Sequence, residues 1–117
     1  MPTVDQIERT YSFALRVLRL CRSLPRTMEH GVLGKQLLRC ATSVGANYRS
    51  ARIAKSRADF VSKIKTCEEE CDESEYWLSL MVDGEMIKAD LVADLRREAH
   101  ELTSIFTASI KTAREGN

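Results

Sequence analysis

Apolar residues recur every three or four positions through four successive stretches of the chain, and this spacing constrains the fold more than any other feature. Residues spaced in this way lie on one face of an α-helix. Both prolines fall outside these stretches and few glycines interrupt them, so the turn signals of an all-β fold are missing. Because short segments join the stretches, the pattern predicts an all-α protein, an antiparallel up-down four-helix bundle. The predicted helices cover residues 5–24, 32–54, 57–83 and 90–114.

Local signals set the limits of these helices. Pro25 cannot continue a helix, and Gly84 is a common type of helix stop. Ser56 followed by Asp59 resembles a capping box, so we expect the third helix to begin there rather than to continue the second. Gly45 lies inside the second helix, where glycine is less favourable than alanine by about 1 kcal/mol, and it therefore indicates close packing against a neighbour.

The first predicted helix carries two apolar stripes, which is more than one seam of a bundle needs. The first stripe is the predicted core face and comprises Ile7, Tyr11, Ala14, Leu15, Leu18 and Cys21. The second stripe is either the rest of a broad core face or a contact with another subunit. Trp77 lies off the centre of its own helix's stripe and has the same two interpretations. The candidate interface residues are Phe13, Val17, Leu20, Leu24 and Trp77.

The size of the chain, 117 residues and 13.3 kDa, fits a single domain over residues 1–117. No apolar run approaches the ~18 residues that a membrane span needs, and the N-terminus lacks the basic and apolar regions of a secretion signal. We therefore expect a cytoplasmic protein with no membrane partner. No CxxC pair occurs, so we expect buried thiols rather than disulfides or a zinc site at Cys21, Cys40, Cys67 and Cys71.

The sequence makes no positive case for an enzyme. A di-iron helical bundle uses Glu-x-x-His pairs, but His30 precedes its predicted helix and His100 has Arg97 three residues before it. Motifs of phosphate-binding loops, serine hydrolases and zinc proteases are also missing from the sequence. We therefore expect a non-enzymatic protein with no catalytic residues, no cofactor and no metal site.

Charge is strongly segregated along the chain. Residues 32–58 contain six basic residues and no acidic one, whereas residues 59–75 contain seven acidic residues and two lysines. Two interpretations stay open. The basic residues pair with acids of a neighbouring helix or subunit, or they form a ridge, joined by Arg9, Arg16 and Arg19, that binds nucleic-acid phosphates. The ridge residues are Lys35, Arg39, Arg49, Arg52, Lys55 and Arg57.

The pairing interpretation makes a specific prediction. Asn47 lies beside the apolar stripe of its helix, and Glu70 flanks the stripe of the next helix. Half-buried polar groups must be hydrogen-bonded. We therefore expect one network that fixes the register of the two helices, made by Arg39, Asn47, Glu70 and Glu73.

Three segments together resemble one known family. They are Leu37 to Asn47 with the sequence LLRCATSVGAN, then Ala58-Asp59-Phe60, and then Glu70, Glu73, Trp77 and Leu78. From Tyr11 to Ala113 the chain is similar to the small four-helix-bundle proteins encoded by intervening sequences inside bacterial 23S ribosomal RNA genes. Ser50 departs from the family pattern, which often has a glutamate three residues after the asparagine. Any polar pairing made by that glutamate in relatives is therefore not implied for this chain.

The resemblance implies an antiparallel bundle that assembles as a homopentameric ring, with the chain itself as partner. A distant relation, the accessory protein of diversity-generating retroelements, is a basic pentameric bundle that binds nucleic acid and a reverse transcriptase. We interpret the sequence as a non-enzymatic oligomeric bundle that binds the backbone of RNA or DNA through the ridge. The alternative is a structural or protein-interaction scaffold that docks another protein and has no nucleic-acid role. A metal or redox role for Cys67 and Cys71 is the weakest alternative.

Overall fold

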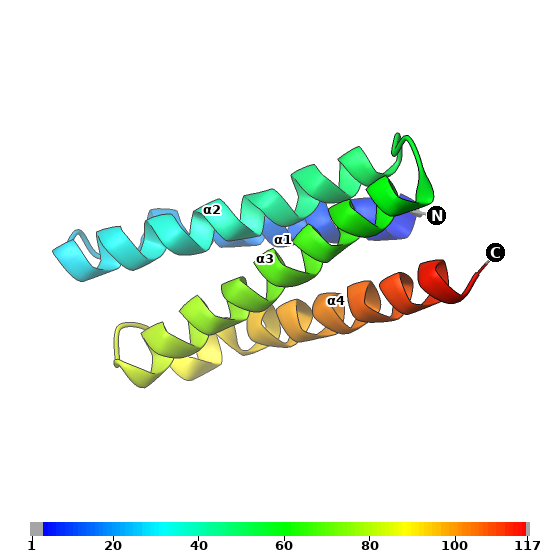
Figure 1. Cartoon of the computed structure of the whole chain (residues 1–117). Coiled ribbons are helices and arrows are strands. Elements are labelled where there is room, and N and C mark those ends of the chain that lie inside the picture. The colour runs from blue at the N-terminus through cyan, green and yellow to red at the C-terminus, as the bar shows by residue number, and fades with distance from the viewer. Residues whose placement is uncertain (1–3, 117) are drawn as a thin grey trace.

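Four α-helices and no strand are formed by residues 4–116, the part of the chain that the computed structural model describes. Helix α1 covers Val4–Ser23, α2 covers Met28–Ala51, α3 covers Arg57–Asp83 and α4 covers Ala89–Glu115. The helices run up and down beside one another in an elongated body of 49 × 21 × 19 Å (Figure 1). The prediction of an all-α protein with four helices is confirmed. The ends of the predicted domain, residues 1–3 and 117, lie outside the described residues.

Helix α2 begins and ends earlier than the sequence predicted. It starts at Met28 because Thr27 caps it, its Oγ1 accepting a hydrogen bond of 3.1 Å from the backbone N–H of His30. His30 therefore lies in the first turn of α2, not before the helix. At the other end, the backbone N–H groups of Ile53 and Ala54 donate to carbonyl oxygens three residues earlier, as in a 3₁₀-helix, and not four residues earlier. The α-helix therefore ends at Ala51.

The predicted start of α3 at a Ser56 cap is confirmed, with a return bond from Asp59 that reaches one residue further back than in a capping box. The Oγ of Ser56 accepts a bond from the Asp59 backbone N–H, and the Asp59 carboxylate accepts one from the Lys55 backbone N–H. That backbone bond, together with the Lys63 ammonium 3.0 Å away, holds the pKa of the Asp59 carboxyl below its ordinary value. The α2–α3 turn is thus fixed by its own polar groups.

The core lies mainly between α2, α3 and α4. On α2 and α3 the buried residues recur at the helical spacing, among them Leu37, Val44, Ile64 and Leu78. Helix α4 supplies the other side with its buried residues Val92, Leu95, Ala99, Leu102, Phe106 and Ile110. Burial of these apolar side chains is the main force that holds the three helices together.

Helix α1 differs from the prediction, because the middle of the predicted core stripe faces outward while its ends, Ile7 and Cys21, pack against the core. Phe13 and Val17 are fully buried within the single chain, so for these two candidate interface residues the structure favours the other interpretation, a broad core face. Tyr11, predicted to be in the core, is 66 % exposed. We call Thr10, Phe13 and Val17 the inner stripe, and Tyr11, Ala14, Leu15 and Leu18 the outer stripe. Leu20, Leu24 and Trp77 are half-buried at the edge of the core.

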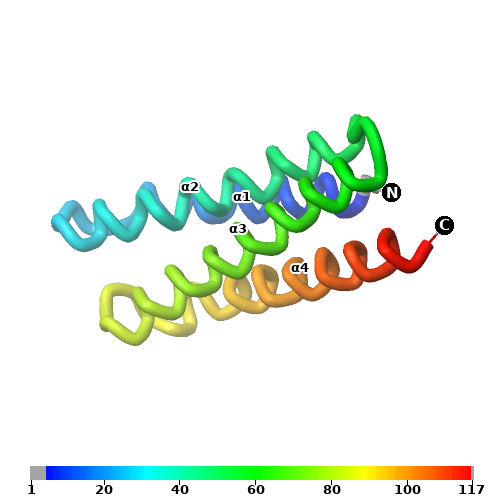
Figure 2. The backbone as a smooth tube through the Cα atoms, viewed as in Figure 1, coloured from blue at the N-terminus to red at the C-terminus, as the bar shows by residue number. Residues whose placement is uncertain are grey.

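Helix α1 packs chiefly along α2 and has little contact with α4 (Figure 2). The approach to α2 is close at Gly45, since a Cβ atom there would lie 3.4 Å from the carbonyl oxygen of Thr10. The link to α4 is ionic: the Arg9 guanidinium lies 2.6 Å from Glu98 and 3.3 Å from Glu101. By the helical period, Arg9 lies on the side of α1 opposite the outer stripe. Because Arg9 faces α4 and the inner stripe faces α2, the outer stripe faces neither of these helices directly.

Candidate nucleic-acid interface

Arg39 belongs to an ion-pair network between α2 and α3. Its Nη1 lies 3.3 Å from a Glu70 carboxylate oxygen, and its Nη2 lies 2.5 Å from Glu73. The indole N–H of Trp77 donates to the same Glu73 oxygen at 3.1 Å. The predicted network therefore exists for these residues and ties α2 to α3. Because its guanidinium is engaged in this way, Arg39 is the least available member of the predicted ridge.

Asn47 was predicted to join this network, and here the prediction is wrong. Its side-chain amide donates instead to the carbonyl and the hydroxyl oxygen of Ser43, both at 2.9 Å. Ser43 lies one helical turn before Asn47 on the same helix. The amide is thus satisfied within α2 and does not help to set the register between helices.

Four of the predicted ridge residues gather at the α2–α3 turn. Arg49, Arg52, Lys55 and Arg57, which we call the basic turn, are all exposed. Within residues 4–116, none of these four side chains forms an ion pair. Lys35 is also exposed and unpaired within that range, but it lies about 21 Å from Arg49 along α2. The ridge is therefore split into a paired arginine, a separate lysine and a compact basic end.

The basic turn borders two open hollows. One, of about 490 Å³, is lined by Arg52, Lys55 and Arg57 with Phe60 and Ala113. The other, of about 560 Å³, is lined by Arg49 and Arg52 with Ala46, Ser50 and Ile53. Arg52 lines both hollows. Cations at such openings can approach phosphate oxygens without first breaking an internal ion pair.

The three arginines of α1 that were predicted to join the ridge divide in the same way. Arg9 is held by the two glutamates of α4 and is not part of the basic turn. Arg16 and Arg19 form no ion pair within residues 4–116, but they lie on a helix that does not supply the turn. The basic surface is therefore smaller than the sequence suggested.

The cysteines are free thiols, and Cys40, Cys67 and Cys71 are buried while Cys21 is half-buried. Burial raises the pKa of Cys67 and of Cys71 to about 12 in each case. Such thiols are protonated at neutral pH and are poor nucleophiles and metal ligands. Within residues 4–116, no three His, Cys, Asp or Glu side chains gather where they could share a metal ion.

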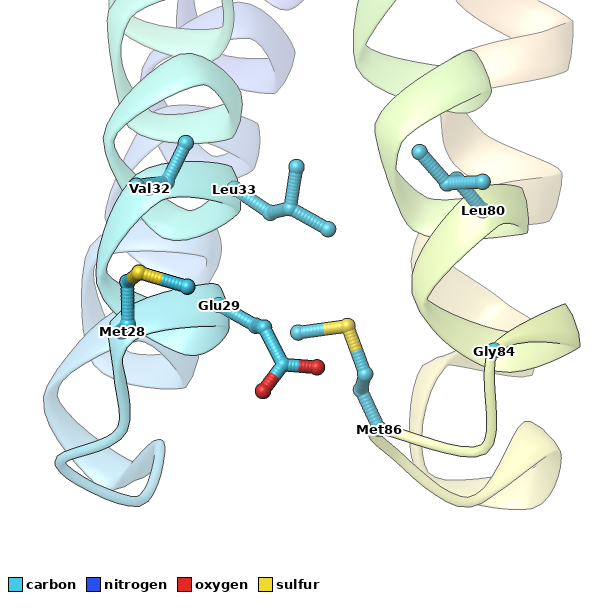
Figure 3. Close-up of a pocket in the computed structure, with 7 residues that line it drawn as sticks. All are labelled: Met28, Glu29, Val32, Leu33, Leu80, Gly84 and Met86. Atoms are coloured by element: carbon cyan, nitrogen blue, oxygen red, sulfur yellow. The ribbon is translucent and has the colours of Figure 1, made fainter.

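Sequence analysis missed a second surface, a groove of about 370 Å³ between the start of α2 and the end of α3 (Figure 3). It is lined by Met28, Glu29, Val32, Leu33, Leu80, Gly84 and Met86. Met28 and Val32 lie off the core stripe of α2, and this was the signal that could have revealed the groove.

Among the described helices, none combines the length and apolar character of a membrane span.

The fold and the basic turn define a small four-helix protein with four exposed cations gathered at the α2–α3 turn. The family model for the 23S rRNA-intervening sequence protein matches residues 3–108, and the chain belongs to this family. This agrees with the resemblance found in the sequence. No curated protein matches the chain.

A solved structure supports the same assignment. It is a crystal structure of a protein of unknown function from the S23 ribosomal protein family of Bacteroides thetaiotaomicron VPI-5482. This chain is 35 % identical to it, with a TM-score of 0.84 over 91 % of this chain and 95 % of that chain.

Proposed function

We propose that this chain is a non-enzymatic, cytoplasmic homopentamer that binds the backbone of RNA or DNA through the basic turn. The single observation that carries the proposal is the set of four exposed cations, Arg49, Arg52, Lys55 and Arg57, without an internal ion pair among residues 4–116. The cations of the basic turn repel one another in the protein without nucleic acid, and bound phosphates reduce this repulsion. Five copies would present the turn several times to one nucleic acid and raise the overall affinity. The free thiols support a reducing compartment.

Salt dependence tests this proposal. Binding of unrelated RNA and duplex DNA sequences should weaken as salt rises, because each contact with a phosphate releases counterions. Changing Arg49→Gln and Arg52→Gln together should weaken binding similarly for all sequences. The slope of log affinity against log salt should become less steep by about 1.4–1.8 units.

The matched control carries Arg26→Gln and Lys88→Gln. Both residues are exposed and unpaired within residues 4–116, and they lie at the other end of the bundle. The control removes the same charge and should bind as the native protein does, with an unchanged mass by light scattering. Native protein that fails to bind at 50 mM salt would contradict the nucleic-acid role.

The homopentamer has its own test. Light scattering at micromolar concentration should give five times 13.3 kDa for the native protein. A mass of one chain would contradict the ring. The pentameric number rests on the family resemblance, and the apolar outer stripe of α1 supports assembly because solvent-exposed apolar patches are favourable to bury.

The second candidate function is a scaffold that docks another protein and has no nucleic-acid role. Exposed apolar side chains outside the α2–α3 groove favour it, because Tyr76 is 58 % exposed and Leu91 is 65 % exposed. A ring that forms normally but binds no nucleic acid would support this candidate over the first.

A further inference from the structure

We propose that the outer stripe of α1 in one copy of this chain occupies the α2–α3 groove of a neighbouring copy. The proposal rests on the proposed homo-oligomer and names the two surfaces that would join its subunits. It uses other residues of α1 than the candidate interface residues of the sequence, two of which, Phe13 and Val17, are fully buried.

Two distinct apolar surfaces remain open on the single chain. The outer stripe contains Tyr11, 66 % exposed, with Leu15 and Leu18 half-buried beside it. The groove opens between α2 and α3, where Leu33 and Leu80 face one another across the gap and the ribbon of α1 lies behind α2 (Figure 3). Because different helices form the two surfaces, one copy can offer both at once.

The groove has a fixed shape. His30 joins its lower end, since its Nε2 lies 3.0 Å from the carbonyl oxygen of Met86 in the α3–α4 turn. The His30 Nδ1 lies 2.7 Å from the Thr27 hydroxyl, so the ring bridges the two turns at this end of the bundle. The walls of the groove are therefore held in place before any partner binds, which lowers the entropy loss on binding.

The dimensions of the two surfaces agree. From Tyr11 to Leu18 the outer stripe rises about 10 Å along α1. The α2 wall of the groove, from Met28 to Leu33, rises about 8 Å. A groove of this length accepts about one and a half turns of an apolar helix face, most of the length of the outer stripe.

The charges beside the two surfaces are complementary. Glu29 lines the groove, and Asp83 and Glu85 flank the lining residue Gly84, with no ion pair for these three acids among residues 4–116. Arg19 and Arg22 border the outer stripe and are likewise unpaired in that range, with Glu8 at its N-terminal end. The cations Arg26 and Lys88 lie two residues outside the lining residues Met28 and Met86, so the three acids exceed them by one. A rim with an excess of acids favours a helix face bordered by cations over one bordered by acids.

A contact between two unlike surfaces accounts for a closed ring. A contact between two different surfaces leaves one stripe and one groove free on every pair, so further copies can add until the circle closes. A contact of the stripe with itself would instead stop at two chains. A ring with an odd number of subunits therefore requires a contact of the first kind.

Mixing two broken variants tests the proposal. Leu15→Glu damages the stripe and Val32→Glu damages the groove, so each variant alone should have the mass of one chain, a fivefold drop from the ring. Mixed in equal amounts, they should form a two-chain species, because one intact stripe and one intact groove remain. Ile53→Glu is the control: Ile53 is 80 % exposed outside both surfaces, and this variant should keep the native mass.

The outcomes separate this inference from the proposed function. Native protein with the mass of one chain would overturn the homo-oligomer and the inference together. A native ring with an unchanged Val32→Glu variant would overturn only the inference, as would two single-chain variants that do not combine. If Leu15→Glu loses its helical circular dichroism, Tyr11→Glu replaces it, since Tyr11 is already largely exposed.

Discussion

The two stripes of α1 have similar apolar residues but different surroundings. On the inner stripe, Thr10, Phe13 and Val17 are fully buried, although one of them is polar. The Thr10 hydroxyl is satisfied because it donates to the carbonyl oxygen of Ile7 at 3.1 Å. On the outer stripe, Tyr11 and its neighbours remain at least partly exposed. Hydrophobicity therefore does not decide which stripe is buried; the fit of α1 against α2 decides it.

The largest expected effect comes from truncating the inner stripe. Phe13→Ala should lower the free energy of unfolding by about 3–5 kcal/mol, because a fully buried ring leaves a cavity. Leu15→Ala on the outer stripe removes contacts of a half-buried side chain and should destabilise the chain much less. Urea unfolding of both variants at the same protein concentration measures the difference.

Dilution separates the two variants further. The destabilisation by Leu15→Ala should shrink when the protein is diluted until native assemblies dissociate, since a subunit contact contributes only while copies are bound. The destabilisation by Phe13→Ala should persist in the dissociated chain. Equal losses for the two variants in the dissociated chain would contradict the assignment of inner and outer stripes.

The comparison also shows where sequence reasoning succeeds. Helices α2 and α3 each carry one dominant apolar stripe, so the helical period identified Leu37, Val44, Ile64 and Leu78 as core. The cap at Ser56 was predictable because its bonds are local in sequence. Helix α1 has two stripes, and periodicity contains no information about which of them a neighbouring helix covers.

The candidate site was predictable to the same extent. The basic run was visible in the sequence, and so was the pairing of Arg39 with the acidic helix. Arg39 is paired and the basic turn is not because of which acids of α3 lie beside which residues of α2. That alignment is set only when the two helices pack. The groove was missed because Leu80 and Met86 join Val32 only after α2 and α3 pack.

The second prediction concerns two buried thiols in the core against which the inner stripe packs. Cys67 and Cys71 belong to the same core cluster as Phe13, and burial raises the pKa of each thiol to about 12. An unfolded thiol ionises at lower pH, so between pH 9 and 12 the unfolded state binds fewer protons and stability falls as pH rises. Going from pH 8 to pH 10, the ionisation of each thiol in the unfolded state should lower the free energy of unfolding by about 1.4 kcal/mol.

Urea unfolding at pH 8 and at pH 10 checks this prediction. The control is the double variant Cys67→Ala, Cys71→Ala, whose stability should change less between the two pH values because both raised thiol pKa values are gone. The same alkaline loss in native protein and double variant would show that other groups cause it, and that these thiols are not shielded as the burial indicates.

The smallest effect tests the close approach that selects the inner stripe. Alanine favours a helix over glycine by up to about 1 kcal/mol, and Gly31→Ala should gain most of this because nothing lies within 4 Å of its added Cβ. Gly45→Ala has the same intrinsic advantage, but its Cβ would lie 3.4 Å from the Thr10 carbonyl oxygen and 3.7 Å from the Thr10 hydroxyl. We expect a smaller gain in stability at Gly45 than at Gly31, measured by thermal and urea unfolding. Gly45→Leu, whose longer side chain must displace α1, should lower stability below that of the native protein. If all three substitutions stabilise equally, the approach of α2 to Thr10 does not limit the packing of α1, and another contact must determine which stripe faces inward.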